Sequence, residues 1–412
     1  MKAGWEIKPL GKLTAKIGSG ATPKGGRNAY KQEGIALIRS MNVHDLQFRV
    51  KDLARIDEDQ ATKLSIVEVE KNDVLLNITG ASIARCCVVP DDIIPARVNQ
   101  HVAIIRPKQG EVDPEFLAYL LVSKEHKDKL LGIGDDAGAT RQALTKSHIQ
   151  NYEIPIPPLE EQKRIVAVLD AAFERLTRAA DHAETNLQNA RELFESYLEN
   201  SYQGEFRQAT QLRDLIEISH GYAFKSKDFE AIVDKSLPVV LTPGNYTEDA
   251  RIDIGTKRTK RLLSADVPTD YLFNRGELTV VMTDLSSKMK ILGLPAFVEA
   301  DSVLHNQRIG RVKFKNDDLS SKYLYYYLRT AAARNRIKAT ASGTMVRHTA
   351  PTRILDLEIP LIGPDEQQAV VLKLDDLAKK ASKLKELFQS KLTDIADLRQ
   401  SLLQKAFAGE LT

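Results

Sequence analysis

A glycine-rich segment near the N-terminus holds the side chains best suited to contact phosphate. Residues 18–27 place Ser19, Thr22, Lys24 and Arg27 among glycines. Because glycine has no side chain, the backbone and the short hydroxyls beside it can approach a phosphate group closely. We interpret this segment as a candidate DNA-contact loop. An ordinary surface loop is the alternative.

Residues 220–227, in the second half of the chain, are the counterpart of this loop. Their sequence, HGYAFKSK, places Tyr222, Lys225 and Lys227 beside a glycine. The mixture of basic and hydroxyl-bearing side chains predicts the same contact with phosphate. A mobile surface loop is again the alternative.

The densest basic cluster lies at residues 257–261. Its cationic members are Lys257, Arg258, Lys260 and Arg261. Such a cluster predicts either a phosphate clamp or a strand whose charged side chains are solvated.

Two loops that follow expected strands carry side chains suited to base edges. An expected strand at 73–79 leads into Thr79, Ser82 and Arg85, and its counterpart at 275–283 leads into a loop with Lys288. Hydroxyl groups and the cationic ends of Arg and Lys can hydrogen-bond to base edges in a DNA groove. A hairpin turn is the alternative at both places.

These candidates come in pairs because the chain repeats itself. The dipeptide Glu161-Gln162 recurs as Glu366-Gln367, and the Gly-Glu at 204–205 recurs at 409–410, each 205 positions later. Arg141 and Arg347 follow glycines at matching positions of the two halves, so we add both to the candidate DNA contacts.

The repeated unit is a globular part followed by a long helix. Residues 159–206 and 365–412 each carry apolar side chains at alternating spacings of three and four, which form a narrow stripe on a helix. A stripe this narrow is typical of a coiled-coil seam, and the equal lengths favour antiparallel pairing. Two independent helices, each folded onto its own domain, are the alternative.

We therefore predict an α+β protein with a pseudo-two-fold internal repeat. Mixed α/β globular domains at 1–158 and 207–364 are separated by two long helices that pair as an antiparallel coiled coil. The chain has 412 residues, 42% of them hydrophobic and 28% charged, with a net charge of +3. Since no apolar stretch is long enough to span a membrane and no signal core begins the chain, we expect a cytoplasmic location.

No pattern for catalysis or metal binding is visible. Gly20 and Gly25 have the spacing of a phosphate loop, but Gly26 stands where the lysine belongs. The eight histidines are scattered. Cys86 and Cys87 are neighbours in an expected strand, so their side chains face opposite ways and we expect both to be inert. The sequence predicts no catalytic residue and no metal site.

Four runs together resemble the specificity subunits of Type I restriction–modification systems. PPLEEQKRIV at 157–166 opens the first helix, and LRQSLLQKAFAGEL at 398–411 resembles the usual ending of that family. WEIKPLG at 5–11 and IGSGATP at 17–23 are similar to its domain start. The second helix opens with IGPD at 362–365 and lacks the double proline.

The resemblance implies that each globular part is a target recognition domain that reads one half of a split double-stranded DNA sequence. The helices would set the gap between the halves and dock two methyltransferase subunits, and two restriction/translocase subunits would complete the enzyme. The expected partner contacts are Glu161, Gln162, Glu366, Gln367 and Phe407.

The resemblance further implies that this chain is not an enzyme and holds no cofactor. S-adenosylmethionine would bind the methyltransferase partner, and ATP and Mg²⁺ the motor/nuclease partner. Two other functions stay open from the residues: a two-headed adaptor that binds no DNA, and a nuclease whose site the sequence does not reveal.

Overall fold

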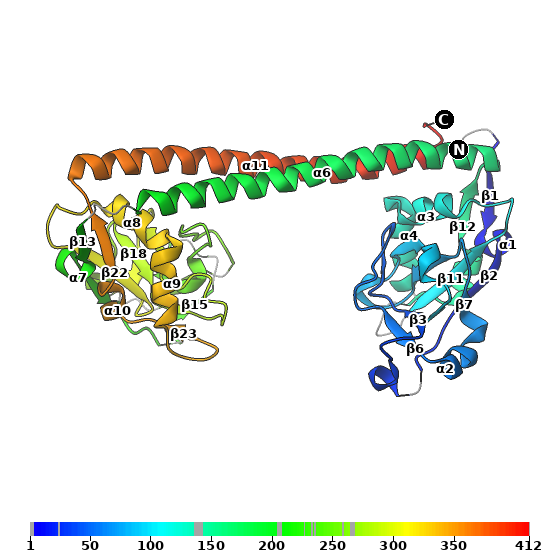
Figure 1. Cartoon of the computed structure of the whole chain (residues 1–412), viewed down its shortest axis with the longest axis horizontal. Coiled ribbons are helices and arrows are strands. Elements are labelled where there is room, and N and C mark those ends of the chain that lie inside the picture. The colour runs from blue at the N-terminus through cyan, green and yellow to red at the C-terminus, as the bar shows by residue number, and fades with distance from the viewer. Residues whose placement is uncertain are drawn as a thin grey trace. The chain divides into compact units, whose positions relative to one another are not determined.

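The computed structural model describes residues 4–23, 25–135, 143–203, 208–225, 227–231, 234, 236–257, 259–263 and 268–411. The chain divides into two compact units (Figure 1). The first unit comprises Met1–Glu184 and Gln389–Thr412, and the second comprises Thr185–Phe388. The long helices α6 (Leu159–Ser201) and α11 (Pro364–Ala408) each contribute one part to both units.

The first unit contains two four-stranded sheets. The antiparallel sheet has the order β2-β11-β8-β9, with bounds Thr14–Ser19, Val102–Pro107, Val74–Asn77 and Cys86–Val88. The mixed sheet has the order β6-β3-β10-β7, with bounds Ala54–Ile56, Ile35–Ile38, Ala96–Val98 and Glu68–Val69. In it, β3 and β10 run parallel.

Shorter elements complete the first unit. The paired strands are β1 with β12 (Glu6–Pro9, Glu153–Ile156) and β4 with β5 (Val43–His44, Gln47–Phe48). The helices are α1 (Leu10–Leu13), α2 (Glu58–Lys63), α3 (Pro114–Val122), α4 (Lys124–Asp135) and α5 (Lys146–Asn151).

The second unit repeats this plan. Its antiparallel sheet is β14-β22-β18-β20, with bounds Ile216–His220, Ile309–Phe314, Leu278–Val281 and Pro295–Phe297. Its mixed sheet is β15-β17-β16-β21, with bounds Phe229–Glu230, Lys260–Leu262, Val239–Leu241 and Val303–His305. Here β16 and β21 form the parallel pair, which matches β3 and β10.

Shorter elements also complete the second unit. The paired strands are β13 with β24 (Gln208–Gln211, Glu358–Leu361) and β19 with β23 (Thr283–Asp284, Arg347–His348). The helices are α7 (Leu212–Leu215), α8 (Ser321–Arg329), α9 (Ala331–Ala339) and α10 (Pro351–Leu355).

One helix covers the antiparallel sheet in each unit and forms the main core. Pro114 opens α3 at a position that needs no N–H, and the Asp113 carboxylate accepts hydrogen bonds from Glu115 N and Phe116 N, each at 3.0 Å. The α3 side chain of Phe116 is fully buried against the sheet, as Tyr323 of α8 is in the second unit.

The two long helices run antiparallel within each unit. In the first unit, the Arg399 guanidinium of α11 lies 5.3 Å from the Phe173 ring of α6. In the second, Lys373 Nζ of α11 lies 5.0 Å from the Tyr197 ring of α6. The start of one helix therefore meets the end of the other, which confirms the predicted antiparallel coiled coil and the two-domain α+β fold.

In each unit, segments of both long helices also pack on the globular part. Ile165 and Leu403 belong to the first core, and Leu198 and Leu374 to the second. Cys86 and Cys87 are buried and unpaired on β9. Burial raises the pKa of the Cys86 thiol well above its usual value and that of Cys87 to about 12, so both stay protonated. Among the described helices, none is long and apolar enough to cross a membrane.

Candidate nucleic-acid interface

In the first unit, the glycine-rich loop lies against the turn between β10 and β11. Gly20 N donates a hydrogen bond to Asn99 O at 3.1 Å. A Cβ on Gly20 would lie 1.7 Å from Val98 O, which no side chain tolerates. Glycine is therefore required where the two backbones cross, and the crossing fixes the loop beside residues 99–101.

A chain of polar side chains links three loops at this place. Thr22 Oγ1 donates to Gln100 Oε1. Gln100 Nε2 lies 3.1 Å from His101 Nε2, and His101 Nδ1 lies 2.6 Å from Thr79 Oγ1. The Asn99 side chain holds the turn by accepting from His101 N at 3.0 Å. Two predicted contacts, Thr22 and Thr79, thus meet through two residues that were not predicted.

The other described candidates of the first unit lie around this network. Ser19 is exposed at the end of β2, and Ser82 is half-buried in the loop after β8. Arg85 Nη1 lies 3.4 Å from His44 Nδ1, and Arg85 has no carboxylate partner among the described residues. Burial, with Arg49 and Arg85 adding to it, lowers the pKa of His44 and favours its neutral form.

The second unit builds the same crossing with a different sequence. Tyr222 N donates to His305 O at 2.8 Å, and Gln307 N donates to Tyr222 O at 3.1 Å. A Cβ on Gly221 would lie 2.3 Å from His305 O. Asn306 Oδ1 accepts from Arg308 N at 3.0 Å, as Asn99 does from His101 N. The exposed side chains of Gln307 and Arg308 therefore stand where Gln100 and His101 stand in the first unit.

An aromatic cluster supports the loop at 220–227. The Tyr222 ring, 43% exposed, lies 4.8 Å from the Phe224 ring and 5.4 Å from the Tyr271 ring in edge-on contacts. Lys225 and Lys227 are exposed beside it. An exposed ring and two exposed lysines within one short segment suit contact with sugar and phosphate.

Successive side chains of strand β17 point to opposite faces, and this separates the members of the basic cluster at 257–261. Lys260 is exposed and its Nζ lies 4.8 Å from the Phe229 ring. Arg261 points the other way, is buried, and donates from Nη1 to Leu237 O at 2.6 Å. The Arg261 guanidinium is therefore engaged inside the domain. Lys257 is exposed, and Arg258 lies outside the described residues.

The loop after β19 is held by β23. In the backbone register of the two strands, Asp284 lies opposite Arg347. Thr283 Oγ1 lies 3.0 Å from His348 Nδ1. Lys288 is exposed in the following loop, and Arg347 is half-buried. Lys24, Arg141 and the side chain of Arg27 lie outside what the structure describes, so their predicted contacts stay predictions.

The turns at 99–101 and 306–308 were missed as candidate contacts, although their likeness is visible in the sequence. The runs NQH and NQR mark the internal repeat and read as strand starts. Their significance depends on the backbone crossing at Gly20 and Gly221, which local sequence does not reveal. Glutamine suits adenine, and arginine suits guanine, in the major groove.

The expected partner contacts are mostly engaged within the chain. Gln162 and Gln367 are buried, and Glu161 accepts a hydrogen bond from Trp5 Nε1 at 3.2 Å. Phe407 is half-buried with its ring 5.5 Å from that of Phe116. Glu366 is exposed. Partner contact at these five positions stays a prediction, and Glu366 is the most exposed of the five.

No cluster of three or more His, Cys, Asp or Glu side chains suited to a metal occurs among the described residues. The family model of the Type I restriction modification DNA specificity domain matches the chain twice, over residues 2–184 and 208–393. The chain belongs to this family. The two matches coincide with the two halves of the internal repeat.

Individual relatives agree with this assignment. The Type I restriction enzyme EcoKI specificity subunit of Escherichia coli (strain K12) is 21% identical, covering 99% of this chain and 89% of that protein. The MjaVIII specificity subunit of Methanocaldococcus jannaschii is 24% identical, covering 83% and 80%.

Solved structures share the fold. A chain from a structure of the type I restriction–modification system has a TM-score of 0.75 at 18% identity, covering 100% of this chain and 99% of that one. The HsdS subunit from Thermoanaerobacter tengcongensis has a TM-score of 0.60, also at 18% identity, covering 100% and 98%. As members of the specificity family, the two globular domains of this chain are DNA specificity domains.

Proposed function

We propose that this chain is the specificity subunit of a Type I restriction–modification enzyme and that each globular domain reads one half of a bipartite DNA target. One observation carries the proposal. Both domains present an Asn-Gln-x turn beside a glycine crossing, and the third residue is His101 in one and Arg308 in the other. The same frame with different side chains suits two half-sites of different sequence.

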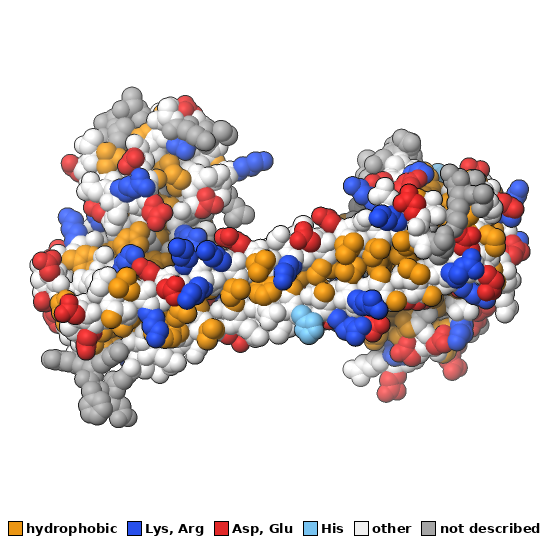
Figure 2. Space-filling model, turned by 90° about the horizontal axis from the view of Figure 1, so that it is seen from above, with side chains coloured by type: hydrophobic (Ala, Val, Ile, Leu, Met, Phe, Trp, Pro, Cys, Tyr) orange, Lys and Arg blue, Asp and Glu red, His pale blue; other side chains and the backbone are white. Residues whose placement is uncertain are grey.

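The helices α6 and α11 set the distance between the half-sites and dock two methyltransferase subunits. Figure 2 shows hydrophobic side chains gathered along an exposed face of these helices. The exposed large apolar side chains of the two helices are Val168, Leu193, Leu372, Leu384, Leu387 and Leu398. Apolar surface of this kind on a helix is typical of a protein–protein interface.

The chain itself does no chemistry in this proposal. The methyltransferase subunits bind S-adenosylmethionine, and two restriction/translocase subunits bind ATP and Mg²⁺. The complex acts on double-stranded DNA in the cytoplasm. The family assignment and the exposed polar loops support this division of labour.

A map of methylated adenines tests the proposal. We expect cells that express this chain with its methyltransferase to methylate a split motif, and cells without this chain not to. Exchange of residues 210–345 for those of a relative should change one half of the motif. If a formed complex methylates nothing new, the adaptor function replaces the proposed one.

A further inference from the structure

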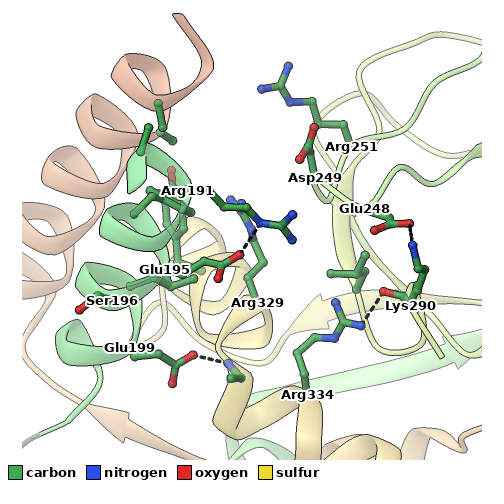
Figure 3. A pocket seen from close by; sticks show the side chains of 18 of the residues that line it. Arg191, Glu195, Ser196, Glu199, Glu248, Asp249, Arg251, Lys290, Arg329 and Arg334 are labelled. Carbon is green, nitrogen blue, oxygen red and sulfur yellow. Dashed lines mark hydrogen bonds and ion pairs between the residues drawn. The ribbon is translucent and has the colours of Figure 1, made fainter. Parts of the chain in front are cut away.

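A cavity of about 790 Å³ lies within the second unit, where α6 and α11 meet α8, α9 and the loops around Asp249 and Lys290 (Figure 3). Eight of the side chains that line it are Lys or Arg, and four are Asp or Glu. In Figure 3 the side chains of Arg191, Arg329 and Arg334 enter the space between α6 and these loops. The cavity therefore has an excess of positive charge.

The four carboxylates are already engaged. Glu195 pairs with Arg191 at 2.9 Å, Glu248 with Lys290 at 2.6 Å, and Asp249 with Lys385 at 2.9 Å. Glu199 accepts from the backbone N of Ala331. The side chains of the three ion pairs are more than half exposed. Pairs this exposed are weak, so an incoming anion can exchange with them.

Five cations have no carboxylate partner among the described residues: Arg251, Lys288, Arg329, Arg334 and Lys338. Arg334 donates from Nη2 to Lys290 O at 2.7 Å, while its Nε is buried without a partner. Burial lowers the pKa of Arg334. It also lowers that of Lys338, with the charge of Arg334 adding to the effect. Glu248 and Asp249 act on Arg334, Arg251 and Arg329 through space, but none of these cations is held in an ion pair with a carboxylate among the described residues.

The cavity continues the candidate DNA interface. Lys288 and Lys290 line it and belong to the loop that follows β19, where we predict base contacts. Through its bond to Lys290 O, Arg334 holds that loop from the side of α9. A ligand in the cavity would thus lie next to the loop that reads the DNA.

We propose that this cavity receives backbone phosphates of the DNA that the second domain reads. The inference rests on the proposed function. Guanidinium and ammonium groups that lack carboxylates form charge-assisted hydrogen bonds with phosphate oxygens. Such contacts fix the register of the domain on the duplex and carry no sequence information. An acidic segment of a methyltransferase subunit is the competing occupant, and continuity with the β19 loop favours DNA.

The test uses the complete methyltransferase complex and a duplex that contains its mapped motif. The double variant R251Q/K338Q removes two cations whose side chains make no hydrogen bond or ion pair within the described chain. The control K313Q/K379Q removes two exposed lysines of the same unit that do not line the cavity. The dissociation constant is measured between roughly 50 and 200 mM NaCl.

The logarithm of the dissociation constant is plotted against the logarithm of the salt concentration. We expect R251Q/K338Q to make this plot less steep by about two and to leave the methylated motif unchanged. The control should keep the wild-type slope. Neutral methylphosphonates placed one by one along the duplex should weaken wild-type binding at particular positions. The same replacements should add no further loss in the variant.

Equal slopes for the variant and the control would overturn the inference. The variant could instead lose its methyltransferase subunits, while the complexes that still assemble keep the wild-type salt dependence of DNA binding. That result would assign the cavity to a protein partner and would also overturn the inference. If the wild-type complex methylates no motif, the proposed function itself fails. The two failures are therefore distinguishable.

Discussion

The Gln162 side chain of the first unit and the Gln367 side chain of the second bond equivalent backbone groups of their own units. Gln162 Oε1 accepts from Asp113 N at 2.8 Å, and Nε2 donates to Glu111 O and Pro157 O at 3.0 and 2.9 Å. Gln367 Oε1 accepts from Ser320 N at 2.8 Å, and Nε2 donates to Asp318 O and Ile362 O at 2.7 and 2.8 Å. Each glutamine ties the start of a long helix to the loop before α3 or α8.

We predict that Gln162→Leu destabilises the first unit by roughly 2–4 kcal/mol, because three backbone groups lose their partner in a buried place. Trp5 is the single tryptophan of the chain and lies in the first unit. Urea unfolding followed by Trp5 fluorescence should therefore shift to lower urea. The exposed Glu366→Gln serves as control. If Gln367→Leu moves this transition as far as Gln162→Leu does, the bonds do not act within separate units.

We predict that the two Asn-Gln-x turns determine different halves of the target. Gln307→Ala with Arg308→Ala should relax the half-site read by the second domain, since a bidentate base contact contributes about 1–3 kcal/mol of discrimination. Gln100→Ala with His101→Ala should relax the other half. The measurement is the motif of methylated adenines. Loss of preference in both halves from one pair of substitutions would contradict this assignment.

We predict that both units lose stability in mild acid because each buries a neutral histidine. Burial lowers the pKa of His126 and of His305 from 6.5 to about 4. His126 Nδ1 lies 2.8 Å from Tyr152 OH, and His305 Nε2 lies 2.8 Å from Ile309 O. Between about pH 6.5 and 4 the unfolded chain binds these protons and the native chain does not, so unfolding is favoured as pH falls.

The stability that the two histidines contribute is complete above pH 6.5 and lost by about pH 4, at up to ~3 kcal/mol each. Urea midpoints measured across this range should fall for the wild type. His305→Asn should flatten the part of the curve that belongs to the second unit. His182→Asn, at an exposed position, is the control, and a pH dependence that survives His126→Asn and His305→Asn together would rule out this cause.

Much of the architecture could be predicted from sequence because its signals are local or repeated. The apolar stripe of α6 and α11 has helical spacing, and Pro114 with Asp113 marks the start of α3. The common offset of the repeated Glu-Gln and Gly-Glu dipeptides predicts helices of equal length, and the structure gives helices of 43 and 45 residues. The same dipeptides were assigned to partner contact, whereas the structure buries both glutamines, since a repeated polar residue can serve the fold as well as a partner.

The sequence by itself determined the repeat, the paired helices and the basic or hydroxyl-bearing loops, because periodicity and composition are properties of neighbouring residues. Only the tertiary structure decided which of these side chains meet. Thr22, Gln100 and Thr79 come from three segments and form one network because Gly20 crosses the backbone of residues 98–99. Likewise the Arg261 side chain does not join the exposed basic cluster, because its position on β17 directs its guanidinium to Leu237 O. Contacts of this kind depend on backbone crossings and strand facing, which are set by the packing of the whole domain.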